Sequence, residues 1–384
     1  MQKIYDIQEK PKRVFLISIK NNDINDESNA EELEGLCRTL SLDIIAHEKI
    51  RLREKNSKFI IGSGKAEALS QKAKELEADI IISDFNPSPS QQRNWEDLCG
   101  IPVIDRQELI IRIFADRAAT REAELQVKLA ELSYFLPRLA HKYVDLSRQR
   151  GGRYGTKGAG ETKLETDRRK IEKRITQLEK EIEQVSRQRQ NQRRRREKNN
   201  VPVCAIVGYT NAGKSSLLNA LTGANVPAED KLFATLDAVT RKFQCAPGVN
   251  VLLTDTVGFI RSLPHSLIKA FRSTLEEAAL ADILILVLDA SSHDIESNYE
   301  TTVSVLRELG AQEITVIIAL NKIDKLSEKK AEPEIINEER VVERAISLEE
   351  LRNRFPDSIA VSAKTGAGLD ELKLRISNNT LIFR

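Results

Sequence analysis

The chain has 384 residues, of which 40% are hydrophobic, 31% charged and only 5% aromatic. At about 100–200 residues per domain, this length predicts two or three domains, each with a core of its own. No apolar run of about 20 residues is present, and the start MQKIYDIQEKPKR lacks the apolar stretch of a signal peptide. We therefore expect a cytoplasmic protein, a monomer, with no stable membrane insertion.

The net charge of +2 hides one basic segment. Between Arg148 and Lys198 there are 18 Lys and Arg against 8 Asp and Glu. Such a block is most often a solvated helix face, but an excess this local also suits a polyanionic partner such as nucleic acid. The cysteines lack metal-ligand spacing, so we expect reduced core thiols. They are Cys37, Cys99, Cys204 and Cys245.

Residues 1–115 are predicted to form a small α/β domain. Short apolar runs, RVFLISI, LDIIAHE, KFIIGSG and DIIISD, have the character of strands, and the stretches AEELEGLCRTL, KAEALSQKAKELE and SPSQQRNWEDLCG between them have helical spacing. The GSGK at Gly62–Lys65 suggests a phosphate loop but lacks the GxxxxGK[ST] spacing, so we predict a tight turn into a helix there.

Residues 116–199 are predicted to form an antiparallel helical hairpin. Apolar residues repeat every 3.5 positions from Leu125 to Leu146 and again from Ile171 to Val185, as in a coiled coil. Pro137 should interrupt the first helix. Between the seams lies RGGRYGTKGAGETK, which predicts a glycine-rich basic tip at residues 151–160. A plain structural linker between domains is the alternative, and periodicity alone does not separate the two.

Residues 200–384 are predicted to form a domain with a doubly wound sheet, which makes the chain an α/β multidomain protein. The predicted strands are VPVCAIV, VNVLLTDT, DILILVLDA, TVIIALN and DSIAVSA, with helices after most of them. A polar, partly helical insertion, KLSEKKAEPEIINEERVVERAISLEE, precedes the last strand, and a final helix surrounds GLDELKLRI.

The stretch GYTNAGKSS matches a phosphate loop between a strand and a helix. Its glycines let backbone N–H groups approach phosphates, Lys214 reaches the β- and γ-phosphates, and the Ser215 hydroxyl meets Mg²⁺. The predicted nucleotide-binding residues of this loop are Gly208, Tyr209, Thr210, Asn211, Ala212, Gly213, Lys214, Ser215 and Ser216.

The DTVG stretch predicts the γ-phosphate end of the site. Asp255 ends an apolar strand and is placed to act through Mg²⁺, and Gly258 leaves room for the γ-phosphate near a backbone N–H. The next residue, Phe259, cannot orient a water as the glutamine of Ras-like enzymes does. In LFATLD we predict Thr235 as the second hydroxyl on Mg²⁺, with Phe233 at the nucleotide; Thr240 is the other candidate, and an ordinary turn threonine the alternative.

NKID and SAK identify the base as guanine. The Asp324 carboxylate can accept from both guanine N1–H and the exocyclic amine, a donor pair that adenine lacks. The stem of Lys322 can cover the ring, and a backbone N–H of SAK can reach the guanine carbonyl. The predicted base-site residues are Asn321, Lys322, Asp324, Ser362, Ala363 and Lys364. Four elements in this order predict a Ras-like GTPase domain that converts GTP to GDP.

The chain also closely resembles the HflX family of ribosome-associated GTPases. The similarity covers nearly the whole length and rests on GKAEAL, NPSPSQQRNWEDL, VIDRQELIIRIFADRA, GGRYGTKGAGETKLETDRR, LFATLDAVTRKF and DTVGFIRSLPHSLIKAFRSTLEEA. It implies an N-terminal α/β domain, a helical hairpin and a GTPase domain, together with binding to the large ribosomal subunit and splitting of stalled or idle ribosomes under stress. The family's loop usually has proline where this chain has Ala159.

The resemblance gives Phe259 a context, because several GTPases with an apolar residue there use an NAGKS loop whose asparagine helps to hold K⁺. Asn211 occupies that position, and its alternative role is to close the loop by hydrogen bonding. The predicted catalytic residues are Lys214, Asn211, Thr235 and Gly258, with Ser215, Thr235 and Asp255 as metal ligands. His265 is a weaker candidate for a base. Slow hydrolysis, stimulated by ribosomes, follows.

Two other functions remain open from sequence alone. One is a GTPase for RNA modification or for a membrane partner, although the hairpin seams are too narrow for bilayer insertion. The other is ATP-driven RNA remodelling through the N-terminal domain. Nucleotide preference and co-sedimentation with ribosomal subunits discriminate among the three.

Overall fold

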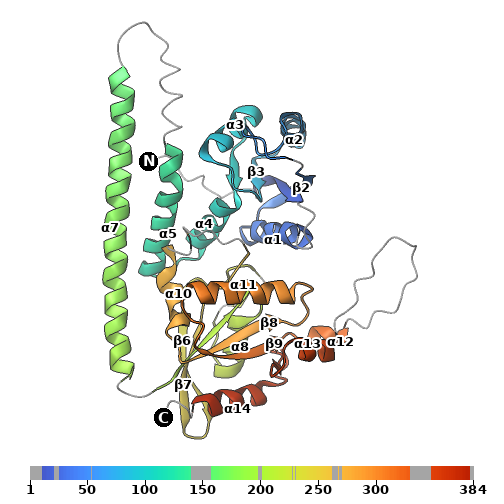
Figure 1. Cartoon of the computed structure of the whole chain (residues 1–384), viewed down its shortest axis with the longest axis vertical. Coiled ribbons are helices and arrows are strands. Elements are labelled where there is room, and N and C mark those ends of the chain that lie inside the picture. Colours follow the sequence, from blue (N-terminus) through green and yellow to red (C-terminus); the bar gives the residue numbers. More distant parts are fainter. Residues whose placement is uncertain are drawn as a thin grey trace, which may run out of the picture. The chain divides into compact units, whose positions relative to one another are not determined.

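The computed structural model of the chain (Figure 1) divides into two units. The first unit comprises residues 1–185 and 264–270, and the second comprises residues 186–263 and 271–384. Within these bounds the structure describes residues 11–20, 26–52, 54–139, 157–197, 201–226, 228–229, 231–261, 267, 270–328 and 347–380.

The first unit contains a four-stranded sheet in the order β2-β1-β3-β4, with all neighbours parallel. Its elements are β1 (Arg13–Lys20), α1 (Asp26–Thr39), β2 (Asp43–Arg51), α2 (Ser63–Glu75), β3 (Ile80–Ser83), α3 (Pro89–Cys99), β4 (Val103–Asp105) and α4 (Arg106–Arg117). The predicted α/β fold is confirmed.

One predicted strand, KFIIGSG, is wrong. Asn56 turns the chain there, because its side-chain oxygen accepts from Lys58 N at 2.7 Å and its backbone pairs with Ile60. Gly62 then precedes α2, so GSGK is the predicted turn into a helix. The fourth strand of the sheet is instead β4, a three-residue segment too short to carry a period of its own.

Ion pairs fill the carboxyl edge of this sheet, beyond β3 and β4. The Arg106 guanidinium lies 3.1 Å from Asp84 Oδ1 and also pairs with Glu32 of α1, and the three side chains are largely buried. Asp105 accepts from Arg138 Nη2 at 3.0 Å. Protein charges therefore occupy the edge at which a ligand of an open parallel α/β sheet usually binds.

The helical segment follows in the order α5 (Arg121–Phe135), a 3-10 turn (Leu136–Arg138) and α7 (Lys157–Glu197). Pro137 lies in the 3-10 turn and ends α5 as predicted. Arg121, at the start of α5, lies 4.0 Å from Glu181 of α7, so the two helices lie side by side there. Leu178 of the second seam is fully buried, which agrees with the predicted packing of the hairpin.

The predicted tip, residues 151–160, lies mostly outside the described residues. Its last four residues are helical, because α7 begins at Lys157, and the prediction of a loop there is wrong. Helix propagation is cooperative, so a long helical segment can extend through residues that lack a helix signal of their own.

The second unit contains a six-stranded sheet in the order β10-β9-β8-β5-β7-β6, parallel except for β6. The strands are β5 (Val203–Gly208), β6 (Val239–Ala246), β7 (Val249–Asp255), β8 (Ile283–Asp289), β9 (Thr315–Asn321) and β10 (Ile359–Ala360). The helices are α8 (Lys214–Thr222), α10 (Arg272–Ala279), α11 (Ile295–Glu308), α12 (Asp324–Glu328), α13 (Leu348–Arg354) and α14 (Leu369–Thr380). Of the insertion, residues 329–346 lie outside the described residues.

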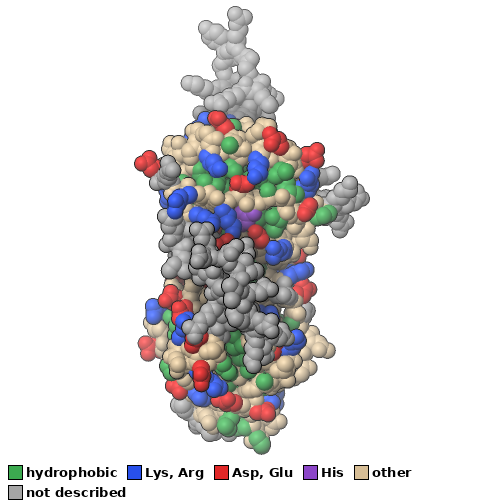
Figure 2. All heavy atoms as spheres, turned by 90° about the vertical axis from the view of Figure 1, so that its right-hand side faces the viewer, with side chains coloured by type: hydrophobic (Ala, Val, Ile, Leu, Met, Phe, Trp, Pro, Cys, Tyr) green, Lys and Arg blue, Asp and Glu red, His purple; other side chains and the backbone are tan. Residues whose placement is uncertain are grey.

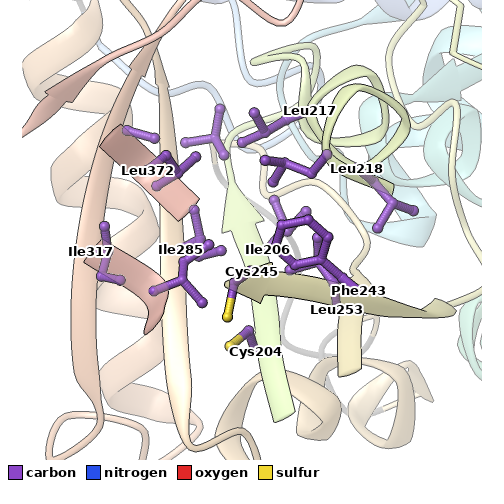
Figure 3. Close-up of a cluster of buried hydrophobic side chains, with 14 of the residues drawn as sticks. Cys204, Ile206, Leu217, Leu218, Phe243, Cys245, Leu253, Ile285, Ile317 and Leu372 are labelled. Carbon is purple, nitrogen blue, oxygen red and sulfur yellow. The ribbon is translucent and has the colours of Figure 1, made fainter. Parts of the chain in front are cut away.

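One face of this sheet packs against α8 and α14 to form the core shown in Figure 3. Leu217 and Leu218 of α8 and Leu372 of α14 meet Ile206 and Ile285 from the central strands. The sequence did not predict β6, an antiparallel edge strand whose Phe243 and Cys245 face the same core. All four cysteines are buried and none is in a disulfide, as expected.

Candidate functional site

A cavity of about 430 Å³ lies at the carboxyl edge of the second sheet. Fourteen of the predicted nucleotide-site residues line it: Thr210, Asn211, Gly213, Lys214, Ser215, Ser216, Phe233, Thr235, Gly258, Asn321, Lys322, Asp324, Ala363 and Lys364. Segments more than 150 residues apart in sequence thus meet around one space.

The loop between β5 and α8 lets backbone approach the cavity closely. Gly213 has φ +91°, and a Cβ there would collide with the Asn321 amide. Gly208 lies so close to the Val287 carbonyl that a Cβ has no room either. Asn211 adopts φ +60° between them. The first N–H groups of α8 have no intrahelical partners, so the end of the loop is suited to an anion.

Lys214 is held inside this loop. Only 7% of the residue is exposed, and its Nζ donates to Tyr209 O at 2.8 Å. Burial lowers the pKa of the amine to about 8, although the Asp255 carboxylate opposes the shift. A polyphosphate in the cavity would raise the pKa of the Lys214 amine again, because a nearby anion favours its charged form. The buried amine is therefore suited to bind an anion.

Three predicted metal ligands gather beside the loop. Ser215 Oγ lies 2.8 Å from Thr235 Oγ1 and donates to Asp255 Oδ2 at 2.6 Å. Asp255 is fully buried, burial raises its pKa, and its Oδ1 has no hydrogen-bond partner. Two hydroxyls and a carboxylate with a spare oxygen are the hard ligands that Mg²⁺ takes. The other threonine candidate, Thr240, instead bonds Thr254 on β7.

No group of three or more His, Cys, Asp or Glu side chains that could hold a metal occurs within the described ranges. In nucleotide sites Mg²⁺ is usually held by one or two carboxylates together with phosphate oxygens and water. Asp255 with the hydroxyls of Ser215 and Thr235 fits Mg²⁺ bound in this way.

The segment after Asp255 is tied directly to the phosphate loop. Phe259 N donates to Gly208 O at 3.1 Å, and Thr210 N donates to Phe259 O at 2.7 Å. The Phe259 ring is buried, with 1% of the residue exposed. Gly258 sits so close that an added Cβ would lie 2.9 Å from Lys214 Nζ. This segment thus presents backbone, and no polar side chain at position 259, to the end of the cavity where the sequence predicts the γ-phosphate.

Hydrogen bonds between loops shape the opposite end of the cavity. Asn321 is buried and links two loops, since its Nδ2 donates to Ala212 O at 2.9 Å and its Oδ1 accepts from Ala363 N at 3.0 Å. The Asp324 carboxylate accepts from Ser362 Oγ at 2.6 Å. Lys322 lies over Asn211, with its Nζ 2.7 Å from Asn211 O. The carboxylate thereby has a fixed orientation in the cavity wall.

Five predicted residues stand behind the wall rather than on it: Gly208, Tyr209, Ala212, Asp255 and Ser362. Six residues that line the cavity were missed: Ala228, Glu229, Lys231, Ala234, Thr256 and Lys325. Each lies within seven residues of a predicted one, but side chains such as Lys231 and Glu229, paired at 3.5 Å, belong to no motif. His265 lies outside the described residues.

Comparison with known families matches four parts of the chain, of which the last two overlap. The N-terminal region of GTP-binding GTPases matches residues 27–115, and their middle region matches residues 117–196. The family described as 50S ribosome-binding GTPase matches residues 203–322, and the GTP-binding domain of elongation factor Tu matches residues 269–380.

Curated relatives cover most of the chain. GTPase HflX of Akkermansia muciniphila is 47% identical over 340 residues, which are 85% of this chain and 78% of the relative. GTPase HflX of Escherichia coli K12 is 40% identical over 368 residues, 96% of this chain and 82% of the relative. The chain belongs to the HflX family of GTPases. It is accordingly a GTP-binding protein and a hydrolase that acts on GTP.

A solved GTP-binding protein of Sulfolobus solfataricus in complex with GDP aligns with 97% of this HflX chain and 100% of its own, at 25% identity and a TM-score of 0.47. Within the described ranges of the HflX protein, no helix combines the length and apolar character needed to cross a membrane.

Proposed function

We propose that the cavity holds GTP with its phosphates at Gly213–Ser216 and its guanine at Asp324. The buried Lys214 amine supplies positive charge to the β- and γ-phosphates, and the N–H groups at the start of α8 bind phosphate oxygens. Gly258 leaves its N–H for the γ-phosphate. Ser215, Thr235 and Asp255 would hold Mg²⁺, which neutralises phosphate charge during transfer. The orphaned Asp255 oxygen supports this assignment.

We further propose that the protein hydrolyses GTP slowly by itself, because Phe259 has no group that can orient water. Asn211 is placed at the loop to help hold K⁺, which would add charge where other GTPases receive an arginine. Phe259→Ala should then change the rate of chemistry only slightly. Hydrolysis rates measured in KCl and in NaCl at equal ionic strength test the Asn211 proposal. If the rates in the two salts are the same, both without ribosomes and with them, the proposal is wrong.

The partner we propose is the large ribosomal subunit, with splitting of stalled or idle ribosomes in the cytoplasm as the outcome. The chain would act through three domains: an N-terminal domain (1–115), the hairpin (116–199) and the GTPase domain (200–384). The family match described as 50S ribosome-binding GTPase supports the partner.

The distribution of charge along the hairpin carries this proposal. The middle of α7, residues 165–183, has six Lys and Arg against six Asp and Glu. Many of these pair along the helix, as Arg168 does with Glu172 at 2.9 Å. The basic excess therefore lies before and after this stretch: residues 148–164 have five Lys and Arg against one acid, and residues 184–198 have seven against one.

On the face drawn in Figure 2, Lys and Arg side chains are interspersed with Asp and Glu. A shaft with balanced charge and basic ends is expected of an arm that contacts RNA phosphates at its ends, because each Lys or Arg that binds a phosphate releases counterions.

Sedimentation with purified ribosomal subunits tests the proposal. Replacing residues 151–160 by a short neutral linker should leave GTP affinity intact, abolish subunit splitting and flatten the salt dependence of ribosome binding. A matched control removes one ion pair of the shaft without changing net charge, as Glu165→Gln with Arg169→Gln, and should behave as the parent. Splitting at the parent's rate by the linker variant would show that the tip is only a connector.

A further inference from the structure

Arg261 is a buried charge next to the nucleotide site with no part in the roles assigned above. Only 7% of the residue is exposed. It stands three residues after Gly258, at the end of the segment that is tied to the phosphate loop. It does not line the described cavity, so its guanidinium is not placed as a cation for the phosphates.

Two separate anchors hold Arg261. Its backbone N donates to the Tyr209 hydroxyl at 3.0 Å, which joins it to the phosphate loop. Its guanidinium Nη2 lies 3.2 Å from Asn298 Oδ1 and 3.4 Å from Asp294 Oδ2, at the start of α11. A buried guanidinium is costly to strip of its partners, so these bonds resist movement of the segment.

The second anchor is a rigid one. Asp294 precedes the first residue of α11, and Asn298 N donates to Asp294 O at 2.9 Å in the first helical turn. The helix packs on β5, the strand that leads into the phosphate loop, and on β8, which pairs with β5. Arg261 therefore ties the segment after Gly258 to the same framework that holds Lys214.

The position of Gly258 leaves little tolerance. A Cβ there would lie 2.8 Å from Thr210 Cγ2 and 2.9 Å from Lys214 Nζ. Since Phe259 offers no polar side chain, the backbone at Gly258 is what this segment contributes to the reacting phosphate. A shift of about 1 Å in a group that positions substrate can lower a rate about 100-fold.

We propose that Arg261 is a positioning residue for GTP hydrolysis, which holds the Gly258 N–H at the γ-phosphate through Tyr209 and the start of α11. The inference rests on the proposed placement of the γ-phosphate at Gly258. GDP lacks that phosphate, so the anchor affects the GTP state and the rate of hydrolysis but leaves GDP binding unchanged.

Single-turnover hydrolysis with the full chain in excess over GTP tests this inference, beside affinities for fluorescent GDP and for a non-hydrolysable GTP analogue. Arg261→Ala should lower the rate about 10- to 100-fold and weaken the analogue, while GDP affinity stays within about twofold. Arg261→Lys should recover part of the rate, because an ammonium can pair with Asp294 but lacks the fork that also reaches Asn298. Tyr209→Phe removes the hydroxyl that accepts from Arg261 N and should also lower the rate.

Arg307→Ala, an exposed arginine in the last turn of α11, is the matched control and should equal the parent. Equal loss of GDP and GTP-analogue affinity with a lower thermal midpoint would overturn the inference, since that is what a purely structural arginine gives. If Arg261→Ala does not fold, the double variant Asp294→Ala/Asn298→Ala cuts the same anchor from the other side, and the parent's rate in that variant overturns it too. A parent that hydrolyses no GTP would instead contradict the proposed function.

Discussion

The two sheets of this protein differ at the same place, the carboxyl edge of their parallel strands. In the first unit, Arg106 with its carboxylate partners and Arg138 with Asp105 occupy that edge. In the second unit the edge is a cavity of about 430 Å³ bordered by glycines. The architecture alone therefore indicates where a ligand can bind, and the side chains at strand ends decide whether there is room for one.

Both units also contain a GK sequence at the start of a helix, and the surroundings of the two glycines differ in the same sense as the two edges. Gly64 of the first has open space where a Cβ would be, whereas Gly213 of the second has φ +91° and the Asn321 amide beside it. A glycine that cannot be replaced marks a close approach of backbone, which a phosphate site requires. A glycine with free space marks only a helix start.

The largest effect is expected from disrupting the filled edge. Arg106→Ala leaves Glu32 and Asp84 buried without their cation, which should cost about 3–5 kcal/mol of the first unit's stability. Trp95, the chain's single tryptophan, is buried in this unit, so its fluorescence during denaturant unfolding reports the loss. Arg38→Ala removes an exposed ion pair to Glu34 and serves as control, with about 0.2–1 kcal/mol expected. Equal losses in both variants would contradict the filled-edge description.

The next effect concerns the open edge. Gly213→Ala forces a Cβ toward the Asn321 amide in a left-handed conformation, a strain of about 1–3 kcal/mol. Affinity for fluorescent GDP should fall about 5- to 150-fold, while the Trp95 transition stays at the parent's midpoint. Unchanged affinity would mean that the glycine is not needed for the backbone to approach phosphate.

A smaller effect should appear with pH at the same edge. Because burial lowers the pKa of Lys214 to about 8, a nucleotide that restores its charge takes up a proton when binding above that pH. Affinity should be constant below pH 7 and should fall by up to about tenfold per unit above about pH 8. Calorimetry in two buffers of different ionisation enthalpy measures the uptake directly. Binding heats that do not depend on the buffer at pH 8.5 would remove this linkage.

The smallest effect completes the comparison of the glycines. Gly64→Ala on α2 meets no atom within 4 Å and should stabilise the first unit by about 0.5–1 kcal/mol, because alanine loses less chain entropy in a helix. Nucleotide affinity should not change. A weaker GDP complex in this variant would assign GSGK a role in nucleotide binding after all.

That the predicted nucleotide-site residues meet around one cavity was predictable, because the four motifs GYTNAGKSS, DTVG, NKID and SAK are local and each lies at the end of a strand. Lys214, Asp255 and Asp324 needed only their neighbours in sequence to be assigned. The filled edge was not predictable, since Arg106 finds Asp84 and Glu32 22 and 74 residues away. β6 was missed because its exposed Arg241 and Lys242 conceal the alternation of Phe243 and Cys245, and KFIIGSG was mistaken for a strand because Asn56 makes a local turn there.

The central claim is that the open edge binds a guanine nucleotide through the Asp324 carboxylate, and the Asp324→Asn variant tests it most directly. Asparagine replaces two acceptor oxygens by one carbonyl and an amide donor. The variant should therefore lose affinity for GTP and gain affinity for xanthosine triphosphate, relative to the parent. The reason is that xanthine has a carbonyl where guanine has an amine. A variant that binds GTP as tightly as the parent would contradict the account.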